Sequence, residues 1–106
     1  MVETDATYLA MPAEDELELT AVLQALADPL RLEIVRELAA ADEERSCGLF
    51  ATQVAPSTRS HHFKTLRDAG VTRTRIAGTR RMVSLRRDEL DRRFPGLVAA
   101  VLDDRR

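Results

Sequence analysis

The sequence predicts a mainly α fold with one small β-hairpin, and three observations lead to that prediction. Leucine and valine recur at three- and four-residue spacings through residues 13–38, as on the buried face of a helix. Residues 57–70 begin with a helix-capping serine and end with a glycine. β-branched residues then stand on both sides of a turn at Gly78, which is typical of a hairpin. A chain of 106 residues is expected to form one domain.

The N-terminal part is expected to hold a mobile tail and two helices. Residues 1–12 lack periodicity and end at Pro12, which indicates the tail, and the folded domain is expected over residues 13–104. Residues 13–26 predict an amphipathic helix with acidic residues in its first turn, where the helix dipole favours them. Asp28 and Pro29 are suited to be the N-cap and first residue of a second helix, from 29 to about 41. The charged residues 42–46 predict a loop.

Two further helices are expected in the middle of the chain. The third covers residues 47–54 and ends at Ala55-Pro56. Ser57 is expected to cap the fourth, which ends where Gly70 adopts a left-handed conformation. At 100° per residue, Phe63, Leu66 and Gly70 fall on one side of this helix. The opposite side is polar and carries Ser57, Thr58, His61, Lys64 and Thr65.

The C-terminal part predicts a hairpin and a last helical segment. Residues 71–76 and 80–85 are the expected strands, joined by a turn at 77–79. Asp88 is a candidate cap for the helical segment, which restarts at Pro95 and has an apolar face beyond it. The order is therefore helix, helix, helix, helix, hairpin, helix. Two helices joined by a tight turn and followed by a two-stranded hairpin describe a winged helix-turn-helix (α-α-α-α-β-β-α).

Charge is distributed unevenly along the chain. The net charge is −2, yet residues 1–28 hold seven acidic residues and no Lys or Arg. Residues 57–93 hold eleven basic residues against four acidic ones. Such an asymmetry favours contact with a polyanion, the alternative being a solvated, salt-bridged surface. Cys47 is the only cysteine, which excludes a disulfide within the chain and indicates a cytoplasmic protein. No apolar run approaches the roughly 18 residues of a membrane span.

Three segments in the same order resemble the ArsR-type winged-helix transcriptional regulators. Residues 26–38, from Leu26-Ala27-Asp28-Pro29 onwards, resemble that family's LADPTRLRIL opening. Residues 57–71 resemble its STVSHHLKVLREAGLV segment, and the third likeness is the hairpin with its Gly78 turn and following arginine pair. The likeness covers residues from about 15 to 102. It implies a homodimeric repressor whose two recognition helices enter successive major grooves of a palindromic operator. It also implies a dimer interface on the first and last helices, which carry Leu17, Leu19, Leu23, Leu97, Val98, Val101 and Leu102.

The residues expected to contact double-stranded DNA come from the fourth helix and the hairpin. Short hydroxyl side chains and His61 can reach base edges or phosphates, whereas Lys64 suits a phosphate. Hairpin arginines suit phosphate contact or a narrow minor groove, or they protect a sheet edge from aggregation. The other interpretation of the helix is a merely solvent-exposed face. The candidate DNA-binding residues are Gln53, Ser57, Thr58, Ser60, His61, Lys64, Arg73, Arg75, Arg80 and Arg81.

Two residues of the fourth helix need a separate interpretation. Arg59 falls on the Phe63 side, where the family usually carries Val or Leu. Because a buried unpaired guanidinium is costly, either its stem extends to the surface or it pairs with an acidic residue. His62 is expected to pack with its ring hydrogen-bonded rather than to bind a metal. It points about 100° away from His61, so the two histidines cannot easily share one ion.

The usual metal ligands of the family are absent or incomplete here. A soft-metal site needs two or three thiolates, and the chain has only Cys47. No cofactor is required, while a transition-metal effector bound by the acidic tail or across a dimer stays open. Cys47 is either a redox switch or, as we favour, a packed small residue. An enzyme is not expected, because no nucleophile–base pair or phosphate loop is present. The alternative function is a winged-helix module that binds a partner protein, with a protein co-regulator setting its activity.

Overall fold

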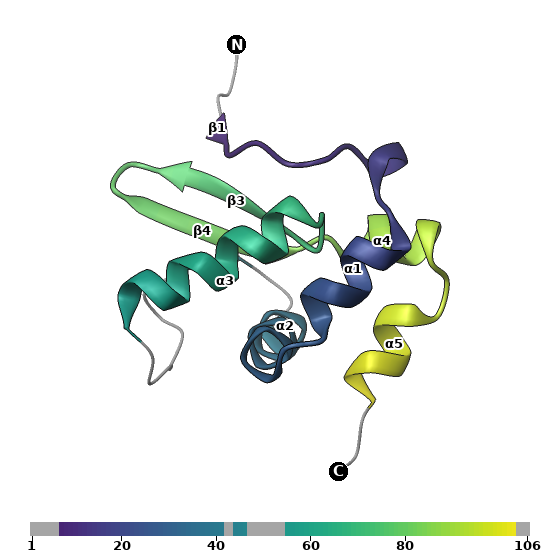
Figure 1. Cartoon of the computed structure of the whole chain (residues 1–106). Helices are drawn as coiled ribbons and strands as arrows, with labels where there is room; N and C mark the ends of the chain where they lie inside the picture. The colour runs from purple at the N-terminus through teal and green to yellow at the C-terminus, as the bar shows by residue number, and fades with distance from the viewer. Residues whose placement is uncertain (1–6, 42–43, 47–54, 104–106) are drawn as a thin grey trace.

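The computed structural model describes residues 7–41, 44–46 and 55–103. The α-helices are α1 (Leu19–Leu26), α2 (Pro29–Ala41), α3 (Pro56–Asp68), α4 (Arg87–Arg93) and α5 (Leu97–Leu102), and a 3₁₀ helix, η1, covers Glu14–Glu16. The strands are β1 (Thr7–Tyr8), β2 (Arg45–Ser46), β3 (Thr72–Ala77) and β4 (Arg80–Leu85). Figure 1 shows α3 alongside the hairpin of β3 and β4, with α4 and α5 at the end of the domain away from the hairpin tip. The predicted winged helix-turn-helix is confirmed.

The hairpin forms the centre of a small sheet. β3 and β4 pair antiparallel from Thr72 opposite Leu85 to Ala77 opposite Arg80, and Gly78 in the two-residue turn has a φ of 64°. The strand order is β1-β3-β4-β2, so each hairpin strand has a two-residue neighbour. Two expectations were therefore wrong. Residues 7–8 pair with β3 instead of belonging to a mobile tail, and residues 45–46 pair with β4 instead of forming a loop. Residues 1–6, 42–43 and the predicted third helix at 47–54 lie outside the described residues.

The start of α2 confirms the predicted cap. The Asp28 carboxylate accepts hydrogen bonds from the backbone N–H groups of Leu30 at 2.9 Å and Arg31 at 3.1 Å. These are donors that the first turn of a helix leaves without an internal partner. The bond from the Arg31 N–H is the main reason that the pKa of Asp28 lies below its ordinary value.

The helix predicted over residues 13–26 is divided into η1 and α1. Leu17 lies between them in an extended conformation, with ψ at 134° and only 1% of its surface exposed. Its side chain packs beneath Gly70, while the backbone C=O accepts a 2.5 Å hydrogen bond from Arg93. Leu17 is therefore buried because the helix is interrupted at this residue. The helical spacing of apolar residues in 13–26 does not predict such an interruption.

The C-terminal helices also begin differently from the prediction. Asp88 lies inside the first turn of α4, whose N-cap position is held by Arg86. α5 starts after Gly96, which has a φ of 87°. Asp88 still stands where the helix dipole favours a negative charge, but its side chain is not the cap.

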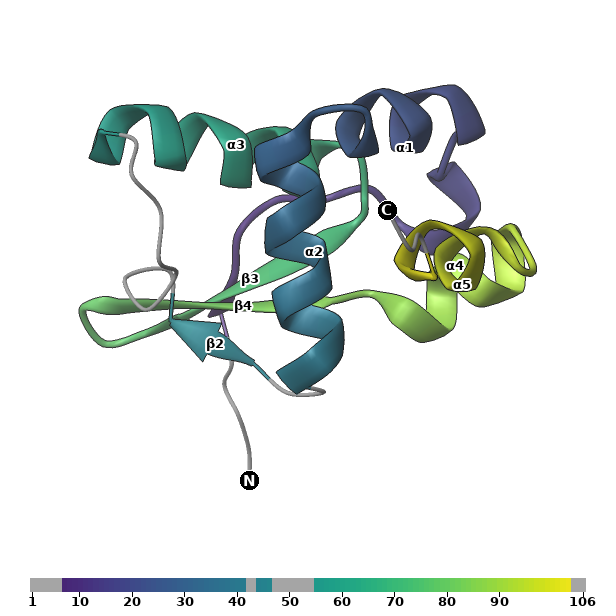
Figure 2. The ribbon, with the colours of Figure 1, turned by 90° about the horizontal axis from the view of Figure 1, so that it is seen from below.

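The core is aliphatic, as the scarcity of aromatic residues indicates. It lies where α1, α2 and α3 meet the sheet and α4 and α5 close one end, as Figure 2 shows from below. Phe63 is its aromatic member, 5% exposed. The largest fully buried aliphatic side chains are Leu17, Val22, Ile34, Val35, Leu38, Leu66, Val71, Val83 and Leu90.

One arginine is buried at the junction of the sheet, the N-terminal segment and α4. Arg86 is 2% exposed; its guanidinium donates two 2.9 Å hydrogen bonds to the Glu89 carboxylate and a third, at 2.7 Å, to the Pro12 C=O. Arg73 also pairs with Glu89. The pKa of Glu89 is lowered, chiefly by the bond from Arg86. Because every partner is charged or strongly polar, this pairing offsets the cost of burying the guanidinium.

No helix in the described part of the chain is long and apolar enough to cross a membrane.

Candidate nucleic-acid interface

The orientation of α3 is fixed at both of its ends and by its apolar side. The helix begins at Pro56, whose fixed φ suits the first helical position, with Ala55 as N-cap. The prediction that Ser57 caps the helix was therefore wrong. At the other end, the N–H of Val71 bonds to the C=O of Leu66 at 2.9 Å, and the N–H of Gly70 bonds to the C=O of Arg67 at 3.0 Å. This pair of bonds is the Schellman motif, and it needs the left-handed Gly70.

The predicted polar side of α3 faces solvent. Phe63 and Leu66 are buried, and this leaves the opposite side of the helix free. Lys64 forms an exposed 2.6 Å ion pair with Asp68, one turn further along the helix. Thr65 is half-buried, and its hydroxyl donates to the backbone C=O of His61 at 3.0 Å. The exposed predicted contact residues are Ser57, Thr58, Ser60, His61 and Lys64, whereas Gln53 lies outside the described residues.

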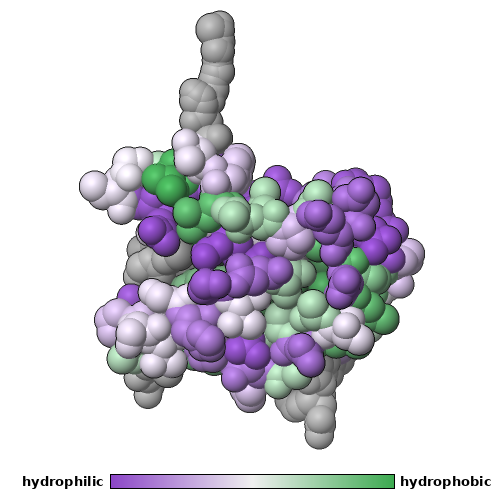
Figure 3. All heavy atoms as spheres, turned by 45° about the horizontal axis from the view of Figure 1, so that its top comes forward, coloured by the Kyte–Doolittle hydropathy of each residue, from purple (hydrophilic) through white to green (hydrophobic). Residues whose placement is uncertain are grey.

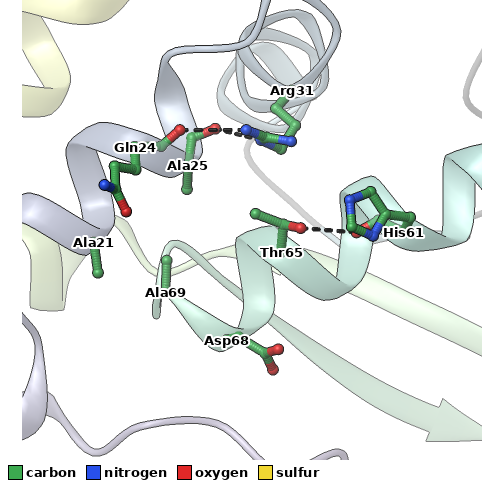
Figure 4. A pocket seen from close by; sticks show the side chains of 8 residues that line it. All are labelled: Ala21, Gln24, Ala25, Arg31, His61, Thr65, Asp68 and Ala69. Carbon is green, nitrogen blue, oxygen red and sulfur yellow. Dashed lines mark hydrogen bonds between the residues drawn. The ribbon is translucent and has the colours of Figure 1, made fainter.

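His62 connects α3 to α2, as expected for a packed histidine. Its Nδ1 lies 3.1 Å from Nη1 of Arg31. Since a guanidinium can only donate, Nδ1 must accept this hydrogen bond. Arg31 also donates to the C=O groups of Ala25 at 2.7 Å and Gln24 at 3.3 Å, which belong to the last turn of α1. Figure 4 shows Arg31 directed at those two carbonyls, across a shallow pocket from His61 and Thr65. One arginine thus holds three helices of the domain together.

The four predicted hairpin arginines are divided between the two faces of the sheet. Thr74 and Val83 are opposite one another and buried, which identifies the face toward the helices. Arg81, opposite Ile76, is on that same face because side chains alternate along a strand. Arg80 is exposed near the tip on the other face.

Arg73 and Arg75 share the face of Arg80 and are held by carboxylates. Arg73 pairs with Glu89, and Arg75 makes two hydrogen bonds to Glu44, at 2.9 and 2.7 Å. The hydrogen bonds from Arg75 keep the pKa of Glu44 below its ordinary value. Arg81 is therefore the predicted hairpin arginine on the side of α3.

Sequence reasoning missed Arg67 as a member of this surface. Arg59, Ser60, Lys64 and Arg67 of α3 line a cleft together with Arg81 of the hairpin. Arg59 is half-buried there, and the acid partner considered for it is not among the residues that line the cleft. Its stem therefore extends along the helix to this opening. The signal for Arg67 was its spacing: residues 59, 63 and 67 form one stripe of a helix.

The residues predicted for a dimer interface occupy three different environments. Leu17 and Val98 are 1% and 3% exposed and belong to the core of the chain itself. Leu19 and Leu23 of α1 are exposed, at 46% and 43%. The α5 residues Leu97, Val101 and Leu102 are partly buried against the core.

Figure 3 shows hydrophobic residues in two places, along the N-terminal segment near the hairpin and on the side where α1, α4 and α5 lie, with hydrophilic residues between them. An apolar surface therefore lies on the side of the domain away from the hairpin tip.

Potential metal ligands are dispersed in the described part of the chain. Within 7–41, 44–46 and 55–103, no three His, Cys, Asp or Glu side chains lie close enough together to hold an ion. Cys47, the candidate redox residue, lies outside these ranges.

The comparisons with known proteins agree with this geometry. Residues 26–75 match the family model of a helix-turn-helix domain. The chain is 36% identical over 94 residues to YceK of Bacillus subtilis (strain 168), described as an uncharacterized HTH-type transcriptional regulator; the match covers 87% of this chain and 94% of that protein. It is 39% identical over 75 residues to an arsenical resistance operon repressor of Staphylococcus xylosus, covering 70% of this chain and 71% of that protein.

An exposed polar helix beside a basic hairpin, on a scaffold shared with these relatives, defines a DNA-binding transcriptional regulator and not an enzyme. Within that class, the chain belongs to the ArsR-type winged helix-turn-helix regulators.

Proposed function

We propose that this chain is a homodimeric repressor that binds a palindromic operator, with α3 as the recognition helix. The observation that carries the proposal is the side of α3 opposite Phe63 and Leu66, which is polar, exposed and flanked by Arg81 of the hairpin. An α-helix fits the major groove, where base edges present distinct patterns of donors and acceptors. A repressor role is supported by the name of the Staphylococcus relative. Such a protein would act in the cytoplasm.

The polar residues of α3 would make different DNA contacts, because their side chains differ in length and charge. Ser57, Thr58 and Ser60 are short and can approach base edges or phosphate oxygens closely. His61 has a ring nitrogen that can donate to a base or a phosphate. Lys64 would neutralise a phosphate, for which it would exchange its exposed pairing with Asp68. Exposed ion pairs contribute at most about 1 kcal/mol, so this exchange costs little.

The first test is affinity for a selected operator. A DNA duplex enriched from a random pool by the purified protein would be titrated by fluorescence anisotropy. His61→Ala and Lys64→Ala should each weaken binding about 5- to 150-fold, which corresponds to about 1–3 kcal/mol per lost contact. Arg92→Ala is the control, because Arg92 is exposed on α4 and pairs only with the likewise accessible Glu14.

Circular dichroism would confirm that each variant is folded. Unchanged affinity in both α3 variants would rule out α3 as the recognition helix. Affinity that does not fall steeply as salt rises would favour the protein-interaction module instead, because phosphate contacts release counterions.

Dimerisation would use the exposed leucines of α1 and the apolar face of α5. Two copies related by a two-fold axis would bury Leu19 and Leu23 and set the two α3 helices one DNA turn, about 34 Å, apart. Both helices lie away from the hairpin tip in Figures 1 and 2, so pairing there would leave the hairpin free.

The corresponding variant is Leu19→Ser combined with Leu23→Ser. It should sediment as a monomer and lose at least about tenfold in operator affinity, because only one half-site contact remains. Met11→Ser is the control, since Met11 is also an exposed apolar residue, 36% accessible, but lies on the N-terminal segment. A double variant that stays dimeric would exclude this interface.

DNA binding by this chain is proposed to need no cofactor. A metalloid such as arsenic requires two or three thiolates, and one protomer supplies only Cys47. The donor set therefore does not fit an arsenic site built within one chain. Operator affinity measured before and after dialysis against EDTA should be the same, and a loss on dialysis would contradict this proposal.

A further inference from the structure

A small cleft separates α3 from the hairpin, and every residue that lines it except Phe63 is polar or basic. It has a volume of about 270 Å³. One wall is α3, and the other comes from the helix-facing side of the hairpin. Phe63 is its apolar lining residue. The polar lining residues are Arg59, Ser60, Lys64, Arg67, Thr74 and Arg81.

The arginines of this cleft differ from five others of the described chain, which each pair with a carboxylate. Arg73, Arg75 and Arg86 each pair with a glutamate, and α4 adds two arginines paired with acidic residues. Within the described ranges, Arg59, Arg67 and Arg81 take part in no such ion pair. Three guanidinium groups therefore share a confined space without an opposite charge, and their mutual repulsion favours an anion between them.

One residue that lines this cleft, Thr74, has a buried hydroxyl without a hydrogen-bond partner. Thr74 is 1% exposed, and its Oγ1 makes no hydrogen bond. Buried hydroxyl groups in native proteins are almost always hydrogen-bonded, so this one indicates a missing acceptor or donor. An anionic oxygen in the cleft would accept the protons of the guanidinium groups, and that of the Thr74 hydroxyl once this buried group turns toward the opening.

Arg59 adds a guanidinium group to this cleft at a position where the family usually carries Val or Leu. Arg59 and Arg67 stand two turns apart on α3, a rise of about 12 Å, and both side chains line the cleft. A planar guanidinium can bond two oxygens of one phosphoryl group, which lysine cannot do. Three arginines around one opening match a tetrahedral oxyanion with several acceptor oxygens.

We propose that this cleft is a binding site for a phosphoryl oxyanion, with Arg59, Arg67, Arg81 and the Thr74 hydroxyl as its ligands. The phosphoryl group is either a phosphate of the DNA backbone, held between α3 and the hairpin, or free inorganic phosphate acting on the regulator. The first source rests on the proposed function, and the second does not.

The first experiment uses inorganic phosphate alone. The full chain, labelled with ¹⁵N, would be titrated with phosphate against chloride at constant ionic strength, and the arginine Nε–Hε signals followed by NMR. The signals of Arg59, Arg67 and Arg81 should shift together and saturate. Arg59→Val and Thr74→Val should weaken this binding at least about tenfold and threefold, while Arg92→Ala should leave it unchanged. Shifts that stay linear and equal for all arginines would overturn the site for free phosphate.

The second experiment measures operator affinity against salt concentration for the same variants. If the ligand is a backbone phosphate, Arg59→Val should reduce the slope of log affinity against log salt by about one. If the slope is unchanged but phosphate binding is lost, the ligand is free phosphate. Normal behaviour of Arg59→Val and Thr74→Val in both experiments would overturn the proposal.

If the proposed function is wrong, the variants should give a different set of operator affinities. His61→Ala and Lys64→Ala would then leave operator affinity intact, whatever the Arg59 variant does. Thr74→Val removes one hydroxyl at nearly constant volume, so it provides a folded variant even if Arg59→Val does not fold.

Discussion

Replacing Gly70 with alanine should destabilise this domain far more than the same change at Gly78. Gly70 has a φ of 84° and ends α3, and Gly78 has a φ of 64° in the hairpin turn. A Cβ at Gly70 would overlap Cδ2 of Leu17 and approach Cγ of Pro12 to 3.1 Å. A Cβ at Gly78 would meet nothing within 4 Å. Both sites need a left-handed backbone conformation, but only Gly78 has room for an added Cβ.

The expected magnitude follows from these two terms. A left-handed conformation costs a non-glycine residue about 1–2 kcal/mol, which applies at both sites. Overpacking in a filled core adds about 1–3 kcal/mol, which applies only at Gly70. The reduced entropy of the unfolded chain is similar for the two alanines and cancels in the comparison. We expect a loss of about 2–5 kcal/mol for Gly70→Ala and about 1–2 kcal/mol for Gly78→Ala.

Urea unfolding followed by circular dichroism would measure both variants, at one fixed protein concentration because dimerisation adds to apparent stability. In a Leu17→Ala background, the additional cost of Gly70→Ala should fall toward the value for Gly78→Ala, since the overlapping methyl group is gone. Equal losses for the two glycines in the parent chain would refute the steric argument. An undiminished cost in the Leu17→Ala background would refute the role of Leu17.

Two further predictions concern carboxylates. Asp28→Ala should lower the free energy of unfolding by about 1 kcal/mol because α2 loses its cap, whereas Asp28→Asn should retain most of it; urea midpoints of the two variants test this. The folded-state pKa values of Asp28, Glu44 and Glu89 are lowered, so their stabilisation is complete above the unfolded pKa of about 4 and is lost as pH falls through the folded values. Unfolding measured between pH 6 and 3 should show this loss, and Glu89→Gln should reduce it; a flat profile would contradict the pairing.

The parts of the fold that could be predicted depend on signals within a few residues. Asp28 followed by proline determines the start of α2, and Gly70 determines the end of α3 through bonds that span only six residues. The hairpin is equally local, since Gly78 lies between two β-branched segments. Ser57 shows the limit of such signals. Both it and Pro56 favour a helix start, and proline takes the first position because its φ is already fixed.

The parts that could not be predicted depend on partners far away in the chain. β1 pairs Thr7 with Ile76, and β2 pairs Arg45 with Val83, so neither two-residue strand has a pattern of its own. The break at Leu17 likewise follows from its packing beneath Gly70. In each case a contact formed only in the folded domain decides the local conformation.

Contacts in the folded domain also decide which basic residues of the C-terminal half can attract a polyanion. Counting residues 57–93 gives eleven basic residues, but the structure places six of them beside carboxylates: Lys64, Arg73, Arg75, Arg86, Arg87 and Arg92. The Arg73–Glu89 pair joins the sheet to α4, and the Arg92–Glu14 pair joins α4 to the N-terminal segment, so part of the charge stabilises the scaffold. The arginines without a carboxylate among the described residues include Arg59, Arg67 and Arg81, which line one cleft between α3 and the hairpin. The field that attracts a polyanion is therefore concentrated at α3, although the composition spreads it over a third of the chain.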